Sequence, residues 1–182
     1  RIVDHMCVIL PFEKDFYARF NCNVEYVGHP LLDEISKHNF SDTSDFLQRH
    51  EIDNRPILAI LPGSRKQEVK KKLPIMMEAV KDLTSHQIII AGAPTLSADF
   101  YQEFNSDLKI IHNETYELLS NSDLAIVTSG TATLETALYK VPQVVCYKSS
   151  RVSYSIAKRL IKVKYISLVN LIMDKEVVKE LI

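Results

Sequence analysis

The chain has 182 residues, of which 46% are apolar and 25% charged, the proportions of an ordinary soluble globular protein. Its 22 basic residues nearly cancel its 23 acidic ones, so the net charge of −1 argues against a domain built mainly to bind nucleic acid. We identify no secretory signal, and no run approaches the roughly 18 uninterrupted apolar residues of a membrane span.

The opening segment predicts a strand over residues 7–10, a helix over 13–20 and a strand over 24–27, followed by a break at Gly28, His29 and Pro30. We interpret residues 1–30 as the end of an amino-terminal domain, with these three residues as the hinge. Residues 31–182 are then a second domain, incomplete at its carboxyl end. Its first part, 37–55, is polar, with a short helix expected around 45–50.

Four short runs rich in β-branched residues follow, at 57–61, 87–91, 124–128 and 144–147, and most end at glycine or proline. Nearly continuous apolar strands of this length are typical of strands buried on both faces, and segments with helical spacing lie between them. The pattern predicts an α/β fold with a doubly wound, Rossmann-like parallel sheet. In such sheets ligands bind at the carboxyl ends of the strands.

The three cysteines are Cys7, Cys22 and Cys146, without CxxC or Cys/His ligand spacing. The sequence therefore suggests neither a disulfide framework nor a zinc site. Because Cys7 and Cys146 lie in apolar runs, we expect buried, inert thiols in a reducing cytoplasm.

The first candidate ligand loop follows residues 57–61 and contains Gly63, Ser64 and Arg65. A strand that passes directly into a helix presents free N–H groups and the positive end of the helix dipole to an anion. Arg65 can form two parallel hydrogen bonds to phosphate oxygens. The alternative is purely structural, with Ser64 as the N-cap and Arg65 solvated. Neither a Walker A loop nor a GxGxxG fingerprint is present.

The second candidate loop contains Ser129, Gly130 and Thr131, with Glu135 one helical turn later. The carboxylate of Glu135 can accept two hydrogen bonds from the vicinal hydroxyls of a ribose. Alternatively, Glu135 only complements the helix dipole. The two phosphate-compatible loops and the carboxylate at one edge of the sheet together favour nucleotide binding. Gly92 also follows a predicted strand.

A basic segment runs from 148 to 173 and contains no acidic residue before Asp174. It is either a solvated amphipathic helix or a surface that meets anionic lipid or a diphosphate. Its six cations are Lys148, Arg151, Lys158, Arg159, Lys162 and Lys164.

Five motifs resemble, in order and spacing, the carboxyl-terminal half of the lipid-A-disaccharide synthase family. They are YVGHPL (26–31), LPGSR (61–65), SGTATLE (129–135), VP (141–142) and SLVNL (167–171). The resemblance implies a metal-independent, inverting glycosyltransferase of lipid A biosynthesis with two Rossmann-like domains, the GT-B arrangement. Such an enzyme joins UDP-2,3-diacylglucosamine to 2,3-diacylglucosamine 1-phosphate (lipid X) and releases UDP. It implies a cytoplasmic protein, peripheral on the inner membrane of Gram-negative bacteria.

Carried over by motif, Arg65 would bind the UDP diphosphate and act in catalysis, Glu135 would bind the ribose, and Asn170 would bind the nucleotide or its sugar phosphate. Gly92 and the two residues after it would flank uracil. The UDP-sugar is a substrate, so no cofactor and no metal are implied. The acceptor site and the catalytic base would lie in an amino-terminal domain outside this sequence, and the fragment alone would bind UDP without turnover.

Two other functions remain open at this stage. One is an isomerase resembling UDP-N-acetylglucosamine 2-epimerase, which has a similar two-domain plan. The other is a non-catalytic UDP-binding module. The oligomeric state is also open, with a homodimer as one alternative.

Overall fold

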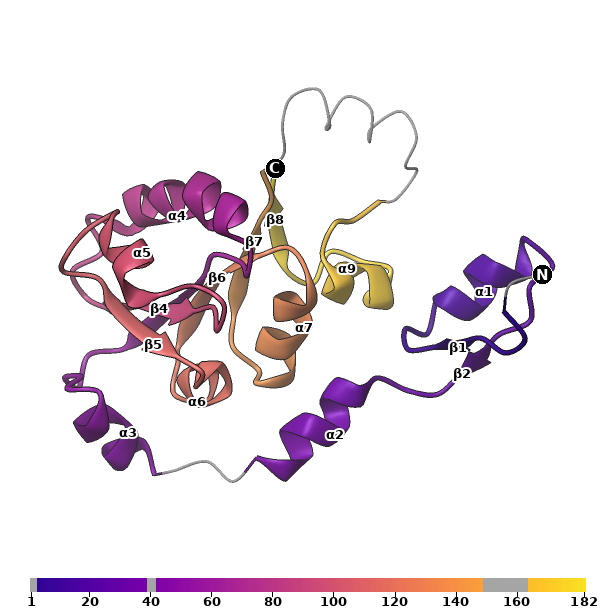
Figure 1. The fold of residues 1–182 in the computed structure, drawn as a ribbon, viewed down its shortest axis with the longest axis horizontal. Coiled ribbons are helices and arrows are strands. Elements are labelled where there is room, and N and C mark those ends of the chain that lie inside the picture. Colours follow the sequence, from indigo (N-terminus) through magenta and orange to yellow (C-terminus); the bar gives the residue numbers. More distant parts are fainter. Residues whose placement is uncertain (1–2, 39–41, 149–163) are drawn as a thin grey trace.

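The computed structural model describes residues 3–38, 42–148 and 164–182, and a six-stranded parallel sheet forms its centre (Figure 1). The strands are β3 (Ile57–Leu61), β4 (Gln87–Gly92), β5 (Lys109–His112), β6 (Leu124–Thr128), β7 (Gln143–Cys146) and β8 (Lys179–Leu181). Their order is β5-β4-β3-β6-β7-β8, so the direction of strand addition reverses between β3 and β6. This order confirms the predicted α/β, Rossmann-like sheet.

The two faces of β3 carry two separate hydrophobic cores. Ile57, Ala59 and Leu61 belong to one cluster, whereas Leu58 and Ile60 belong to the other. Because side chains alternate along a strand, a wholly apolar strand must be covered on both sides, and it is. The first face is covered by α3 (Thr43–Arg49), α6 (Thr115–Ser120) and α7 (Thr131–Leu138), and the second by α4 (Lys66–Val80) and α5 (Ala98–Gln102).

The sheet contains two strands that the sequence did not predict, β5 and β8, and both lie at its edges. Each is only partly covered: β5 has one buried residue, and β8 has none. An edge strand therefore has no continuous apolar run from which it could be recognised. The helix α9 (Leu168–Met173) precedes β8 and packs against α7.

The opening segment forms its own small sheet, away from the six-stranded one (Figure 1). The strands β1 (Cys7–Val8) and β2 (Glu25–Tyr26) are parallel and are joined by α1 (Glu13–Ala18), so all three elements are shorter than predicted. The break at Gly28–Pro30 leads directly into a helix, α2 (Pro30–Lys37), which the sequence did not predict. Pro30 occupies its first turn, and the Nδ1 atom of His29 accepts a hydrogen bond from the Leu31 N–H at 3.2 Å.

The prediction of buried cysteines is wrong. Cys7 is exposed, and Cys22 and Cys146 are partly exposed. In β1 only Val8 is buried, and both residues of its partner strand β2 are exposed. An apolar run in so short a strand does not place each of its residues in a core.

Candidate functional site

The loops after β3, β4 and β6 surround one cavity of about 400 Å³ at the carboxyl edge of the sheet. It lies where the strand order reverses, the position at which open α/β sheets bind ligands. Eight residues singled out from the sequence line it: Gly63, Ser64, Arg65, Gly92, Ser129, Gly130, Thr131 and Glu135. The fold therefore brings together loops that are more than 60 residues apart in the chain.

Two of the lining glycines have backbone conformations that other residues rarely adopt. The φ angle is +114° at Gly63 and +150° at Gly130. An added Cβ at Gly63 would lie 2.8 Å from the Oε2 atom of Glu68, which is the end of a flexible side chain and can move, so the φ angle is what requires glycine here. Both turns from strand to helix thus depend on glycine.

The helices α4 and α7 both begin at the cavity. Their starts carry no side-chain cap within the described chain, and the residue at the N-cap is Arg65 for α4 and Gly130 for α7. The structural alternative that made Ser64 the N-cap is therefore wrong. Uncapped helix starts present N–H groups and a partial positive charge, so two such starts on one cavity favour an anionic ligand.

A buried hydrogen bond joins the two helix-start loops. The Thr128 hydroxyl, at the end of β6, donates to the Pro62 carbonyl oxygen, after β3, at 3.0 Å. Thr128 is 5% exposed, so this bond is shielded from water. Sequence reasoning placed Thr128 at the end of a predicted strand and gave it no role, since its only signal was a hydroxyl residue ending an apolar run.

The Ser129 hydroxyl, next along the loop, donates to the Ile166 carbonyl oxygen at 3.0 Å. Ser129 therefore connects the second loop to the segment before α9. Its oxygen retains lone pairs that could accept a further hydrogen bond.

Arg65 extends from the start of α4 and is the most exposed charge of the site. Its guanidinium lies 3.2 Å from the carboxylate of Glu68, and its side chain is 82% exposed. Exposed ion pairs of this kind stabilise a protein little. Arg65 can therefore turn from Glu68 toward an anion in the cavity at small cost.

Glu135 lies on the first turns of α7 and is half-buried. Burial raises the pKa of its carboxyl group, and no described residue forms a hydrogen bond or an ion pair with this side chain. It lines the main cavity and also a neighbouring one of about 350 Å³, which includes Thr115 and Tyr116. A half-buried carboxylate without a partner among the described residues costs stability, which is typical of a residue retained to bind a ligand.

The turn after β4 is held in place from within the protein. At Gly92 an added Cβ would lie 2.5 Å from the His112 ring, so close packing, not a special φ angle, requires glycine here. The Tyr101 hydroxyl accepts a hydrogen bond from the Ala93 N–H at 2.9 Å, and Tyr101 is fully buried. Burial raises the pKa of this phenol. Tyr101 and His112 thus position a cavity wall without reaching the cavity, and sequence reasoning identified neither.

Asn170 does not line the cavity, and its expected contact with the nucleotide stays a prediction. Its side chain is fully buried, and its oxygen accepts hydrogen bonds from the Val177 and Val178 N–H groups. Its nitrogen donates to the Val178 carbonyl and to Glu180, each at 2.8 Å. With all its bonding capacity used inside the protein, Asn170 fixes the turn between α9 and β8.

Only two of the six cations in the basic segment lie in the described residues. Lys148 and Lys164 are exposed, and Lys164 lies 3.5 Å from Asp174. The other four, Arg151, Lys158, Arg159 and Lys162, lie outside the described residues. Among the helices of the described part, none combines the length and the apolar character needed to cross a membrane.

The family model and the similar proteins that match this chain all carry the same description. A family model described as lipid-A-disaccharide synthetase matches residues 1–182. The chain is 40% identical to a lipid-A-disaccharide synthase from Syntrophus aciditrophicus and 34% identical to one from Solibacter usitatus, in both cases over 100% of this chain and 49% of the relative. It is 38% identical to lipid-A-disaccharide synthase 1 of Legionella pneumophila, over 98% of this chain and 48% of that protein.

The chain thus spans about half the length of the curated relatives that it matches. Its six-stranded parallel sheet with flanking helices is consistent with one domain of a GT-B glycosyltransferase. The match extends over every predicted motif and over the whole chain, so the chain belongs to the lipid-A-disaccharide synthase family.

Proposed function

We propose that the chain is the donor-binding half of a lipid-A-disaccharide synthase. It holds UDP-2,3-diacylglucosamine while the diacylglucosamine unit is transferred to lipid X and UDP leaves. The observation that carries this proposal is the cavity at which the loops after β3, β4 and β6 meet, with Arg65 and Glu135 in its lining. Membership of the family supports the reaction class.

The chemistry of the lining suggests how UDP is oriented. The diphosphate lies at the starts of α4 and α7, near Ser64 and Thr131, where N–H groups are free of side-chain caps. The Glu135 carboxylate accepts hydrogen bonds from the two ribose hydroxyls. Uracil lies against the turn that begins at Gly92. A cavity of about 400 Å³ is within the usual range for a ligand of this size.

Departure of UDP is the step to which this half contributes most. Breaking the bond between the anomeric carbon and the diphosphate oxygen transfers negative charge onto UDP. N–H groups already oriented at the helix starts, together with Arg65, stabilise that charge without a metal ion. Within the described part of the chain, Arg65 is paired with Glu68 alone, through an exposed contact, so it can form charge-assisted hydrogen bonds with the departing phosphate.

The acceptor and the base belong to the other half of the enzyme in this proposal. Inversion requires the lipid X hydroxyl to attack from the face opposite the departing UDP. The base that removes its proton must therefore lie across the cleft from the cavity described here. The chain alone accordingly binds UDP and does not turn over substrate.

Titration calorimetry of the chain with UDP tests the proposal. We expect one UDP per chain, with Arg65→Ala weakening binding by about 10- to 150-fold, the effect of losing hydrogen bonds to a charged group. Arg55→Ala is the matched control, because Arg55 pairs with Asp53 before β3 and does not line the cavity. Absence of heat at millimolar UDP, or equal losses in both variants, would contradict the proposal.

Product analysis of a full-length enzyme that contains this chain separates the alternatives. Transfer requires lipid X, whereas an epimerase converts its UDP-sugar without any acceptor. Disaccharide formed only when both substrates are present supports the proposal. A changed sugar from the UDP-sugar alone would replace it with the isomerase.

We also propose that the basic segment attracts the protein to anionic lipid. Each exposed cation near such a surface contributes about 1 kcal/mol, and salt screens the attraction. The chain should therefore sediment with anionic vesicles at low salt and be released at high salt. Retention in the supernatant at low salt would contradict a peripheral membrane location.

A further inference from the structure

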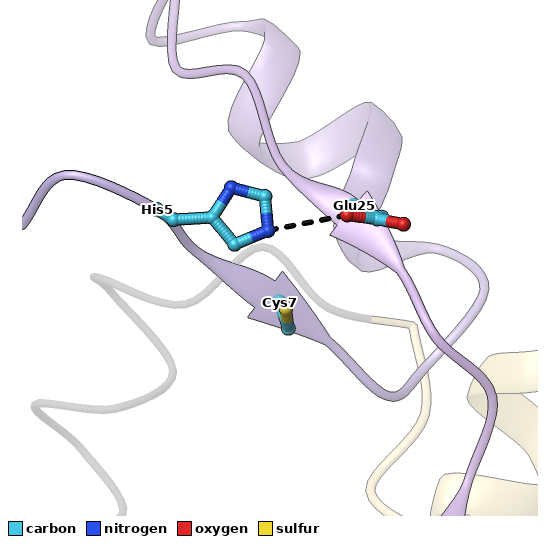
Figure 2. Close-up of side chains that lie close together, drawn as sticks. All are labelled: His5, Cys7 and Glu25. Carbon is cyan, nitrogen blue, oxygen red and sulfur yellow. Dashed lines mark hydrogen bonds and ion pairs between the residues drawn. The ribbon is translucent and has the colours of Figure 1, made fainter.

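His5, Cys7 and Glu25 lie together on the small amino-terminal sheet (Figure 2). His5 and Cys7 are two residues apart, so they lie on the same side of an extended chain. Glu25 lies directly opposite Cys7 in the parallel register of β1 and β2. The Nε2 atom of His5 is 3.1 Å from the Glu25 carboxylate, and one ligand atom from each residue lies within 4.8 Å of the others.

The three side chains supply an imidazole nitrogen, a thiolate sulfur and a carboxylate oxygen, the ligands that Zn²⁺ takes in proteins. Metal–ligand bonds of about 2.0–2.3 Å place the ligand atoms of a tetrahedral site roughly 3.3–3.8 Å apart. The separations in the structure are at most 4.8 Å. All three residues are exposed, so small rotations of their side chains close this difference without moving buried groups.

We propose that His5, Cys7 and Glu25 form a binding site for a single Zn²⁺-type divalent cation. Water completes the four-coordinate shell, because the described residues supply three ligands to the cluster. The thiol of Cys7 releases its proton to solvent when the metal binds. None of the three residues lines the cavity at the carboxyl edge of the large sheet, so this site is independent of UDP binding.

Among the described residues, the small sheet has few contacts of its own, and a bound metal would add a link between its strands. Each of its strands is two residues long, and α1 contains no buried residue. Small two-stranded sheets are marginally stable on their own. A metal that bridges residues 5, 7 and 25 closes the loop that contains α1 and holds β1 against β2.

Cobalt and zinc binding to the reduced chain, prepared without a histidine tag, tests the site. We expect one equivalent of Zn²⁺ in calorimetry and a thiolate-to-metal absorption band with Co²⁺. Cys7→Ser should abolish the band, and His5→Gln and Glu25→Gln should each weaken Zn²⁺ binding by at least about 10-fold. Cys22→Ser is the matched control, since this cysteine lies in the same segment but outside the cluster, and it should leave both signals unchanged.

Hydrogen exchange gives a second readout that does not depend on the metal's spectrum. The Glu25 and Val27 N–H groups donate across the small sheet to the Met6 and Val8 carbonyls, at 3.0 and 3.1 Å. Zn²⁺ should slow exchange at these two amides in the unmodified chain and not in Cys7→Ser. Substoichiometric binding, a Co²⁺ band that survives Cys7→Ser, or exchange that is unaffected by Zn²⁺ would each overturn the proposal.

Discussion

Replacing Thr128 by valine tests the bond that joins the two helix-start loops. Valine has the shape of threonine without its hydroxyl, so the change removes the 3.0 Å hydrogen bond to the Pro62 carbonyl and little else. Thr128 is 5% exposed, so water cannot easily replace the lost donor. A buried carbonyl left without its partner costs about 1–3 kcal/mol.

This cost should appear in both stability and ligand binding. For a chain of this length each kcal/mol lowers the melting temperature by roughly 2–4 °C, which predicts a decrease of about 2–12 °C in Thr128→Val. Urea denaturation followed by circular dichroism measures the free energy of unfolding directly. Because the bond sets the relative position of the two loops, UDP affinity should fall as well.

Thr136→Val is the matched control for this experiment. Thr136 is fully buried, and its hydroxyl donates to the Ala132 carbonyl one turn earlier in α7, at 2.8 Å. The Ala132 carbonyl still accepts its backbone hydrogen bond within the helix, so removing the Thr136 hydroxyl should lower the free energy of unfolding by less. If Thr128→Val is no less stable than Thr136→Val, the bond between the loops does not contribute as argued.

Three further predictions use the same unfolding and binding assays. Glu135→Gln should weaken UDP binding yet stabilise the chain at pH 7, because burial raises the pKa of Glu135. This gain in stability should vanish as the pH falls below the unfolded-state pKa of the carboxyl group. A variant that is less stable than the unmodified chain at pH 7 would contradict this prediction. Asn170→Ala should lower the free energy of unfolding by several kcal/mol, because it breaks the four hydrogen bonds of a buried side chain, and it should leave the UDP affinity of the folded chain unchanged. A loss of UDP affinity without a loss of stability would show that Asn170 takes part in binding. Burial alone would raise the pKa of Glu180, but hydrogen bonds from Ser167, the Ile166 N–H and Asn170 outweigh it and lower the pKa. The stability that Glu180 adds over Glu180→Gln should therefore be complete above the unfolded-state pKa and be lost as the pH falls through the lowered folded value; a difference that does not change with pH would exclude this linkage.

The central part of the sheet could be predicted because its strands are buried on both faces. β3 and β6 have the predicted bounds, β4 is one residue longer at its end, and β7 is shifted by one residue toward the amino terminus. The edge strands β5 and β8 could not be found in this way, since partial exposure gives them a mixed composition. The order in which the strands lie in the sheet depends on how all of them pair, and the local periodicity of the sequence carries no information about that pairing.

The loops of the candidate site were predicted from glycine and hydroxyl residues after apolar strands. Gly63, Gly130 and Glu135 meet at one cavity, as their positions at the ends of β3 and β6 led us to expect. Asn170 was carried over from the family motif alone, and a motif does not reveal which hydrogen bonds a side chain already makes. The sequence also did not reveal Tyr101, which reaches the turn after β4 from α5 through a buried hydrogen bond.

The cluster of His5, Cys7 and Glu25 was missed for a similar reason. Spacing rules for metal ligands detect residues close together in sequence, whereas Glu25 reaches the other two through the pairing of β1 with β2. The sequence suggested no zinc site because the third ligand comes from another strand. Contacts of this kind appear only once the register is known.

The chain has only four glycines, which makes one spectroscopic measurement unusually direct. Selective ¹⁵N labelling gives one amide signal for each of Gly28, Gly63, Gly92 and Gly130, of which the last three line the cavity and Gly28 does not. Titration with UDP should move the signals of Gly63, Gly92 and Gly130 with a common affinity and leave that of Gly28 in place. Unmoved cavity signals at saturating UDP, or a shift at Gly28 alone, would contradict the assignment of this cavity to the donor nucleotide.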